Sequence, residues 1–122
     1  MWIRSWLNNK SQRVCLQGMT SEWMEVLSGV PQGSVLGPLL FLIYINDLDE
    51  SIKSSLLKFA DDTKILRRID SAEDNRQVQE DIDTLLEWSR DWQMTFNTDK
   101  CKVMHISGRN QPCMEYYMEG HK

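Results

Sequence analysis

The chain has 122 residues, a length that fits one domain of ordinary size, and its composition is that of a globular protein with 41% hydrophobic and 26% charged residues. Its formal net charge of −4 argues against a free-standing nucleic-acid-binding module, because such modules take most of their affinity from a basic surface. The charge is compatible with a metal-dependent catalytic piece, since magnesium prefers carboxylate ligands.

The first half of the chain predicts two helices and two strands. Apolar residues at helical spacing predict the end of an amphipathic helix over residues 2–7. Partial alternation over residues 12–18 and 22–27 predicts two strands joined by a short turn. Residues 28–34 are rich in turn formers and predict a loop. A helix is expected over about residues 38–49 and should be buried, because its first two turns are apolar nearly all round.

The second half predicts a hairpin followed by a long helix. Two short apolar runs, residues 55–60 and 63–68, flank the pair Asp61-Asp62, and this two-residue connection predicts a tight hairpin. A long amphipathic helix should begin after Asp70 or Ser71, because each is followed three residues later by an acidic residue that could complete a capping box.

The remaining residues predict two further strands, at residues 101–106 and 114–118, separated by a loop at 107–112. The whole pattern predicts an α+β fold with mostly antiparallel strands in one domain over residues 1–122. No signal peptide is apparent, and the longest apolar run is far below the roughly 18 residues of a membrane span, so an intracellular protein without membrane contact is expected.

The pair Asp61-Asp62 is the strongest candidate for chemistry. Nucleotidyl transfer uses two divalent ions that stabilise the attacking and leaving oxygens, and carboxylates at the tip of a rigid hairpin would present suitable ligands. Two adjacent aspartates are also common in turns, so the pair alone does not decide between a structural and a catalytic role.

Two sequence blocks around this pair carry a family resemblance. The first block is SGVPQGSVLGPLLF at residues 28–41, and the second is FADD at residues 59–62. In this order they closely resemble the palm of reverse transcriptases from non-LTR (LINE-type) retrotransposons, especially the jockey-like group. NTDK at residues 97–100 is similar to the N-x-x-K segment that follows the long palm helix in these enzymes. The resemblance covers nearly the whole chain and implies a partial palm over residues 1–122, with an antiparallel sheet and an Asp-Asp hairpin packed on helices.

The resemblance implies catalytic roles for three residues. Asp61 matches the family's metal-binding aspartate, and Asp62 matches the neighbour that supports or shares the metal site. The implied cofactor is Mg²⁺, with Mn²⁺ as the alternative. Lys100 matches the lysine proposed to protonate the departing pyrophosphate, which is reasonable because a lysine near a triphosphate can act as a general acid or stabilise negative charge.

The resemblance also implies a nucleotide- and template-binding set. Pro31, Gln32 and Gly33 match the loop that lies against the incoming nucleotide and the template base, and Phe59 and Ala60 complete the set beside the aspartates. The implied partners are an RNA template, a DNA primer and deoxynucleoside triphosphates. The implied location is the nucleus or the cytoplasm, and the oligomeric state is left open.

The family palm carries one more catalytic aspartate, on a strand upstream of the first helix. No acidic residue precedes Glu22 here, so the upstream catalytic strand, the fingers and the thumb are expected to be missing. The chain alone should therefore lack polymerase activity. Two alternatives remain: a non-catalytic remnant of the palm that binds RNA or a protein, and a translated relic without a stable fold.

Overall fold

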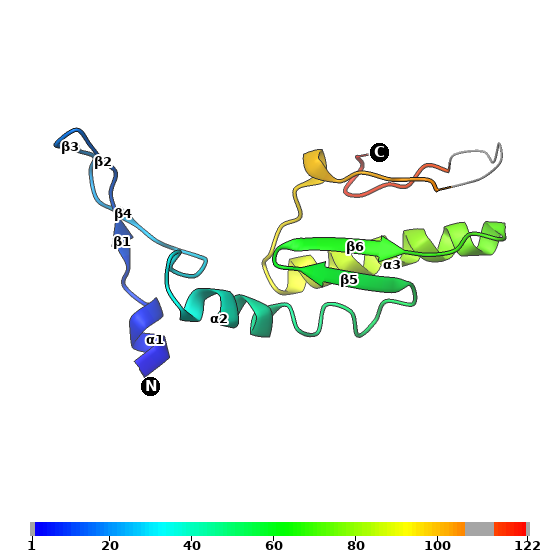
Figure 1. The fold of residues 1–122 in the computed structure, drawn as a ribbon, viewed down its shortest axis with the longest axis horizontal. Helices are drawn as coiled ribbons and strands as arrows, with labels where there is room; N and C mark the ends of the chain where they lie inside the picture. The colour runs from blue at the N-terminus through cyan, green and yellow to red at the C-terminus, as the bar shows by residue number, and fades with distance from the viewer. Residues whose placement is uncertain (1, 107–113, 122) are drawn as a thin grey trace. The chain divides into compact units, whose positions relative to one another are not determined.

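The chain forms helices and small antiparallel sheets, in agreement with the predicted α+β class (Figure 1). The computed structural model describes residues 2–106 and 114–121, so the loop expected at residues 107–112 lies outside the described residues. The fold divides into two compact units, one ending at Ile45 and the other beginning at Asn46. Among the helices described, none has both the length and the apolar character needed to cross a membrane.

The strands of the first unit form one long hairpin in two short stretches. β1 (Ser11–Gln12) pairs with β4 (Met24–Glu25), and β2 (Cys15–Leu16) pairs with β3 (Met19–Thr20), both antiparallel. The register differs by one residue between the two stretches, so one extra residue in the returning chain interrupts the pairing. The two predicted strands are therefore correct in place but are each broken into two.

The first helix of this unit lies where it was predicted, and the second is shorter and less buried than expected. α1 spans Trp2–Leu7, and α2 spans Leu36–Tyr44, two residues earlier at its start than predicted and five earlier at its end. The prediction that α2 is buried is wrong, because Leu39, Leu42 and Ile43 are all more than half exposed. The six-residue α1 and four two-residue strands provide too little structure to cover a helix on all sides.

The second unit consists of a hairpin and a long helix that lies beside it (Figure 1). β5 (Ser55–Phe59) and β6 (Asp62–Leu66) pair antiparallel over their full length, and α3 spans Ala72–Asp91. The 3-10 helix η1 (Thr98–Lys100) follows. Leu48, Leu85 and Leu86 are almost fully buried and form the apolar centre of this unit.

The start of α3 confirms one of the two predicted caps. The Ser71 side chain accepts the backbone N–H of Asp74, and the Asp74 side chain accepts the backbone N–H of Ser71, which completes a capping box. Asp70 is not the N-cap residue. The capping box fixes the direction in which α3 leaves the hairpin.

The strands expected at residues 101–106 and 114–118 are not formed, and that prediction is wrong. Instead, the Gln79 side chain of α3 donates to the carbonyl of Tyr117 over 2.8 Å and accepts its N–H over 2.9 Å. The Tyr116 hydroxyl donates to Asn75 over 2.8 Å. Because Gln79 satisfies both backbone groups of Tyr117, this segment is held on the helix without a strand partner at that residue.

Candidate active site

The tip of the β5–β6 hairpin carries the candidate catalytic aspartates. Phe59 is paired directly with Asp62, so the two connecting residues are Ala60 and Asp61. The predicted connection, Asp61-Asp62, is therefore one residue too late, and Asp62 is instead the first residue of β6. The pairing of β5 with β6 continues as far as Phe59 and Asp62, so Ala60 and Asp61 are the two residues left to form the turn.

Ala60 adopts a left-handed backbone conformation in this turn, with φ of 52°. A two-residue hairpin connection usually has positive φ at its first residue, and glycine or asparagine is the common occupant. An alanine in this region costs on the order of 1 kcal/mol. The surrounding ladder must supply that free energy, so the tip is a slightly strained segment held by its own strands.

One face of the hairpin is open to solvent and the other is half-buried. Phe59 and Asp62 share the open face with their neighbours Leu57 and Lys64, and these four residues line a shallow hollow. Phe59 is 82% exposed, so its side chain is accessible, as the binding role expected for it requires. Ala60 and Asp61 are exposed as well.

The two aspartates have the chemistry of metal ligands but do not form a complete site. Within the described part of the chain, the side chains of Asp61 and Asp62 make no hydrogen bond or ion pair, so their carboxylate oxygens are available. Two carboxylates match the small number of protein ligands that magnesium usually takes beside substrate phosphates. No group of three or more metal-ligating side chains occurs among the residues that the structure describes.

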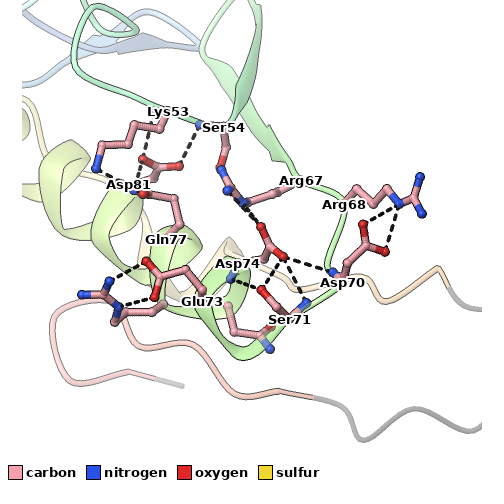
Figure 2. A network of polar contacts seen from close by, with 12 residues as sticks. Lys53, Ser54, Arg67, Arg68, Asp70, Ser71, Glu73, Asp74, Gln77 and Asp81 are labelled. Atoms are coloured by element: carbon pink, nitrogen blue, oxygen red, sulfur yellow. Dashed lines mark hydrogen bonds and ion pairs between the residues drawn. The ribbon is translucent and has the colours of Figure 1, made fainter.

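The base of the hairpin is fixed to α3 by a buried carboxylate (Figure 2). Asp81 is only 1% exposed, and its two oxygens accept the backbone N–H of Lys53 over 3.0 Å and that of Ser54 over 2.9 Å. Gln77 donates a third, longer bond of 3.4 Å. Burial alone would raise the pKa of Asp81, but the hydrogen bonds from Ser54 and from the amide of Lys53 outweigh it and hold the pKa below its ordinary value. Asp81 is therefore a charged anchor immediately before β5.

A second carboxylate of α3 holds the chain after β6. Arg67 donates to one oxygen of Asp74 through Nε over 3.2 Å and through Nη2 over 3.0 Å. The hydrogen bond from Ser71 and the bonds from Arg67 lower the pKa of Asp74 to about 2. Both ends of the hairpin are thus tied to one helix, as Figure 2 shows.

The loop that carries Pro31, Gln32 and Gly33 belongs to the first unit and is closed on itself. The Ser34 hydroxyl donates to the carbonyl of Pro31 over 2.7 Å and accepts the N–H of Gly37 over 2.9 Å. Gln32 and Gly33 are exposed between these fixed points. The loop and the hairpin belong to different units, so a nucleotide-binding site that uses both stays a prediction.

Lys100 is exposed at the end of η1. In the described residues, no hydrogen bond or ion pair joins its side chain to Asp61 or Asp62. Phe59, Ala60 and the two aspartates are consecutive in the sequence and lie at the hairpin tip, and the role of Lys100 beside them stays a prediction.

Sequence reasoning missed both anchors of the hairpin. Asp81 lies one turn of helix from Gln77 and one from Leu85, and all three are buried. An acidic residue on the core-facing side of an amphipathic helix was the available signal. Arg67 and Asp74 are seven residues apart and could not be paired from helical spacing, because Arg67 precedes the helix.

The sequence of this chain is similar to that of known reverse transcriptases over nearly its whole length. Residues 1–117 match the family model described as reverse transcriptase (RNA-dependent DNA polymerase). The chain is 27% identical over 127 aligned positions to the RNA-directed DNA polymerase from mobile element jockey of Drosophila melanogaster, which covers 97% of this chain and 14% of that protein. It is 36% identical over 123 positions to the probable RNA-directed DNA polymerase from transposon X-element of the same species, with 96% of this chain and 14% of that protein covered.

A third relative agrees with the first two. The probable RNA-directed DNA polymerase from transposon BS of Drosophila melanogaster is 32% identical over 107 positions, covering 80% of this chain and 12% of that protein. The chain spans at most 14% of the length of these three relatives. No solved structure matches it. The resemblance predicted from the two sequence blocks is confirmed, and the chain belongs to the reverse transcriptase (RNA-dependent DNA polymerase) family.

Proposed function

We propose that this chain is part of the catalytic palm of an RNA-directed DNA polymerase from a non-LTR retrotransposon, over residues 1–122, and that the β5–β6 tip holds its metal ions. The observation that carries the proposal is the exposed pair Asp61 and Asp62 at the end of a hairpin whose base is anchored at both ends. Such a support suits a site that must hold charged ligands in fixed positions.

The metal that this site would hold is Mg²⁺ or Mn²⁺, and it would stabilise the negative charge that develops on the attacking and leaving oxygens. Asp61 would be the main protein ligand because it lies in the turn itself, and Asp62 would share or support the site from the first position of β6. Among the described residues no third metal-ligating side chain joins this pair. The family resemblance implies a further carboxylate in a complete polymerase, so this chain alone should not extend a primer.

The binding roles follow the family resemblance. Pro31, Gln32 and Gly33 would contact the incoming deoxynucleoside triphosphate and the template base, and the Ser34 hydrogen bonds keep that loop in one conformation. Phe59 and Ala60 would border the same nucleotide from the hairpin. Lys100 would donate a proton to the departing pyrophosphate or neutralise its charge. The template would be RNA and the primer DNA.

The metal site can be tested on this chain by titrating Mn²⁺ while recording the amide signals of the protein. Paramagnetic Mn²⁺ broadens signals near its site, so the amides of residues 60–62 should broaden first. Asp61→Asn should weaken this binding at least about fivefold, because a carboxylate ligand becomes a neutral amide. Asp99→Asn makes the same charge change at an exposed position of η1 and should leave it unchanged.

Equal Mn²⁺ affinity in the wild-type chain and Asp61→Asn would contradict the proposed site. A primer-extension assay addresses the incompleteness separately. The 122-residue chain should give no product with Mg²⁺ or Mn²⁺, and product above the Asp61→Asn background would show that the chain needs no further carboxylate.

A further inference from the structure

Asp81 is the most deeply buried charged side chain among the described residues, and the proposed chemistry does not use it directly. Both of its oxygens are occupied by backbone N–H groups of consecutive residues, Lys53 and Ser54. β5 begins at the very next residue, Ser55. The carboxylate therefore fixes the exact point at which the chain enters the strand that leads to Asp61.

The geometry of the two anchors determines the direction of the hairpin. Asp81 holds the entry to β5, and Asp74 holds Arg67 just after β6. The two anchors are seven residues apart on α3, which is about 10 Å along a helix at 1.5 Å per residue. Two attachment points at that separation fix the orientation of the hairpin, whereas one point would leave it free to swing.

A small rotation of the hairpin at its anchored base produces a larger displacement at its tip. Each strand has five residues, which corresponds to roughly 17 Å at about 3.3 Å per residue. A swing of about 10° at the base would therefore move Asp61 by about 3 Å, and catalytic groups need placement within about 0.5 Å. Loss of one anchor would therefore be felt at the tip even if the strands stayed paired.

We propose that Asp81 is a positioning residue for the aspartates of the hairpin tip, acting through the backbone amides of Lys53 and Ser54. The proposal rests on the proposed function of Asp61 and Asp62 as metal ligands. Asparagine cannot replace Asp81 in this role, because an amide side chain offers one acceptor oxygen and would turn an N–H group toward a backbone N–H.

The first test compares Asp81→Asn with Asp91→Asn in the 122-residue chain. Asp91 is exposed at the last position of the same helix, so the control makes the same charge change away from the hairpin. Mn²⁺ affinity should fall about fivefold or more in Asp81→Asn, measured well below its melting temperature. Asp91→Asn should stay within twofold of the wild-type chain. A purely structural role would lower the melting temperature and leave the affinity of the folded protein unchanged.

The second test does not depend on metal binding and so separates this proposal from the proposed function. Residual dipolar couplings report the orientation of the β5 and β6 amides relative to those of α3. In the wild-type chain and in Asp91→Asn, both elements should fit one alignment tensor. In Asp81→Asn, the hairpin should show reduced couplings relative to the helix. If the wild-type chain binds Mn²⁺ no better than Asp61→Asn, the metal site fails, and the couplings alone decide the role of Asp81.

A milder variant covers the case in which Asp81→Asn does not fold. Asp81→Glu keeps the charge and both acceptor oxygens but moves them by one methylene group, so the hairpin should be displaced rather than released. A folded Asp81→Asn or Asp81→Glu variant with unchanged couplings would overturn the proposal. Loss of folding in both variants would also overturn it, because Asp81 would then be required for stability alone.

Discussion

The two compact units of the chain use their apolar and polar residues differently. In the second unit, Leu48, Leu85 and Leu86 are at most 6% exposed, and Asp81 is buried with its oxygens bonded. In the first unit, the hairpin residues Val14, Leu16 and Met19 are between 69% and 79% exposed. Burial of apolar area is the main source of stability in small domains. The second unit should therefore determine the stability of the chain, and the first should contribute little.

The largest expected effect is a cavity in the second unit. Leu85→Ala removes most of a side chain that is 3% exposed and should lower the free energy of unfolding by about 3 kcal/mol. Leu16→Ala makes the same chemical change at a residue that is 70% exposed and should change it by less than about 0.5 kcal/mol. Urea unfolding followed by circular dichroism measures both, and equal losses would remove the distinction between the units.

An intermediate effect is expected from acid. The folded-state pKa of Asp74 is about 2, below its ordinary value of 3.8, because Ser71 and Arg67 bind the ionised form. A group with a lowered pKa adds stability above its unfolded-state pKa and loses it as the pH falls through the folded-state value. The second unit should therefore become less stable between about pH 4 and pH 2.

Asp74→Asn provides the matched comparison for the acid effect. This variant should be less stable than the wild-type chain at pH 6, and the difference should shrink as the pH approaches 2. Asp70→Asn changes an exposed aspartate whose ion-pair partner, Arg68, is also exposed, and it should behave like the wild-type chain. Thermal unfolding at several pH values, recorded on the signals of α3, measures the difference. A constant gap between Asp74→Asn and the wild-type chain would contradict the assignment.

The smallest expected effect concerns the turn at the hairpin tip. Ala60→Gly relieves the positive φ of 52° but adds freedom to the unfolded chain. The relief of backbone strain stabilises the folded state, and the added freedom of the unfolded chain opposes it by a similar amount. The free energy of unfolding should therefore change by at most about 1 kcal/mol. Ala72→Gly is the control, because Ala72 begins α3 in ordinary helical conformation and has no strain to relieve. A large loss in Ala60→Gly would mean that the methyl group of Ala60 packs on a neighbour.

Helices and turns with clear local signals could be predicted from the sequence. Elements whose structure depends on contacts between distant residues could not. The first helix and the capping box at Ser71 were correctly predicted from local spacing, whereas the second helix was predicted to end five residues too late and wrongly expected to be buried. A hairpin was expected at the place of β5 and β6. The hairpin turn was misplaced by one residue, because nothing in the sequence indicated that Ala60 would accept a left-handed conformation. The strand expected at residues 114–118 was wrong, and the backbone of Tyr117 there bonds instead to Gln79, 38 residues away.

The candidate site was predictable in part. The FADD block, residues 59–62, coincides with the end of the hairpin, where Phe59 pairs with Asp62, and its catalytic role stays a prediction. The position of Asp81 on the core-facing side of α3 was a signal for its burial, but its partners could not be predicted, because they lie 27 and 28 positions away and neither contact has a local signature. Residue type was also misleading, since a carboxylate is normally expected at the surface.

The closed loop before α2 also constrains how that region can move. A side chain at Gly37 would begin 2.9 Å from the Ser34 hydroxyl and 3.0 Å from the carbonyl of Pro31, so the first turn of the helix is seated directly on the loop. The Ser34 hydroxyl bridges the same two segments. The loop and the first turn of α2 are therefore held together by the Ser34 side chain. A residue larger than glycine at position 37 would therefore have to displace either the Ser34 side chain or the carbonyl of Pro31, and would disturb the loop and the start of α2 together.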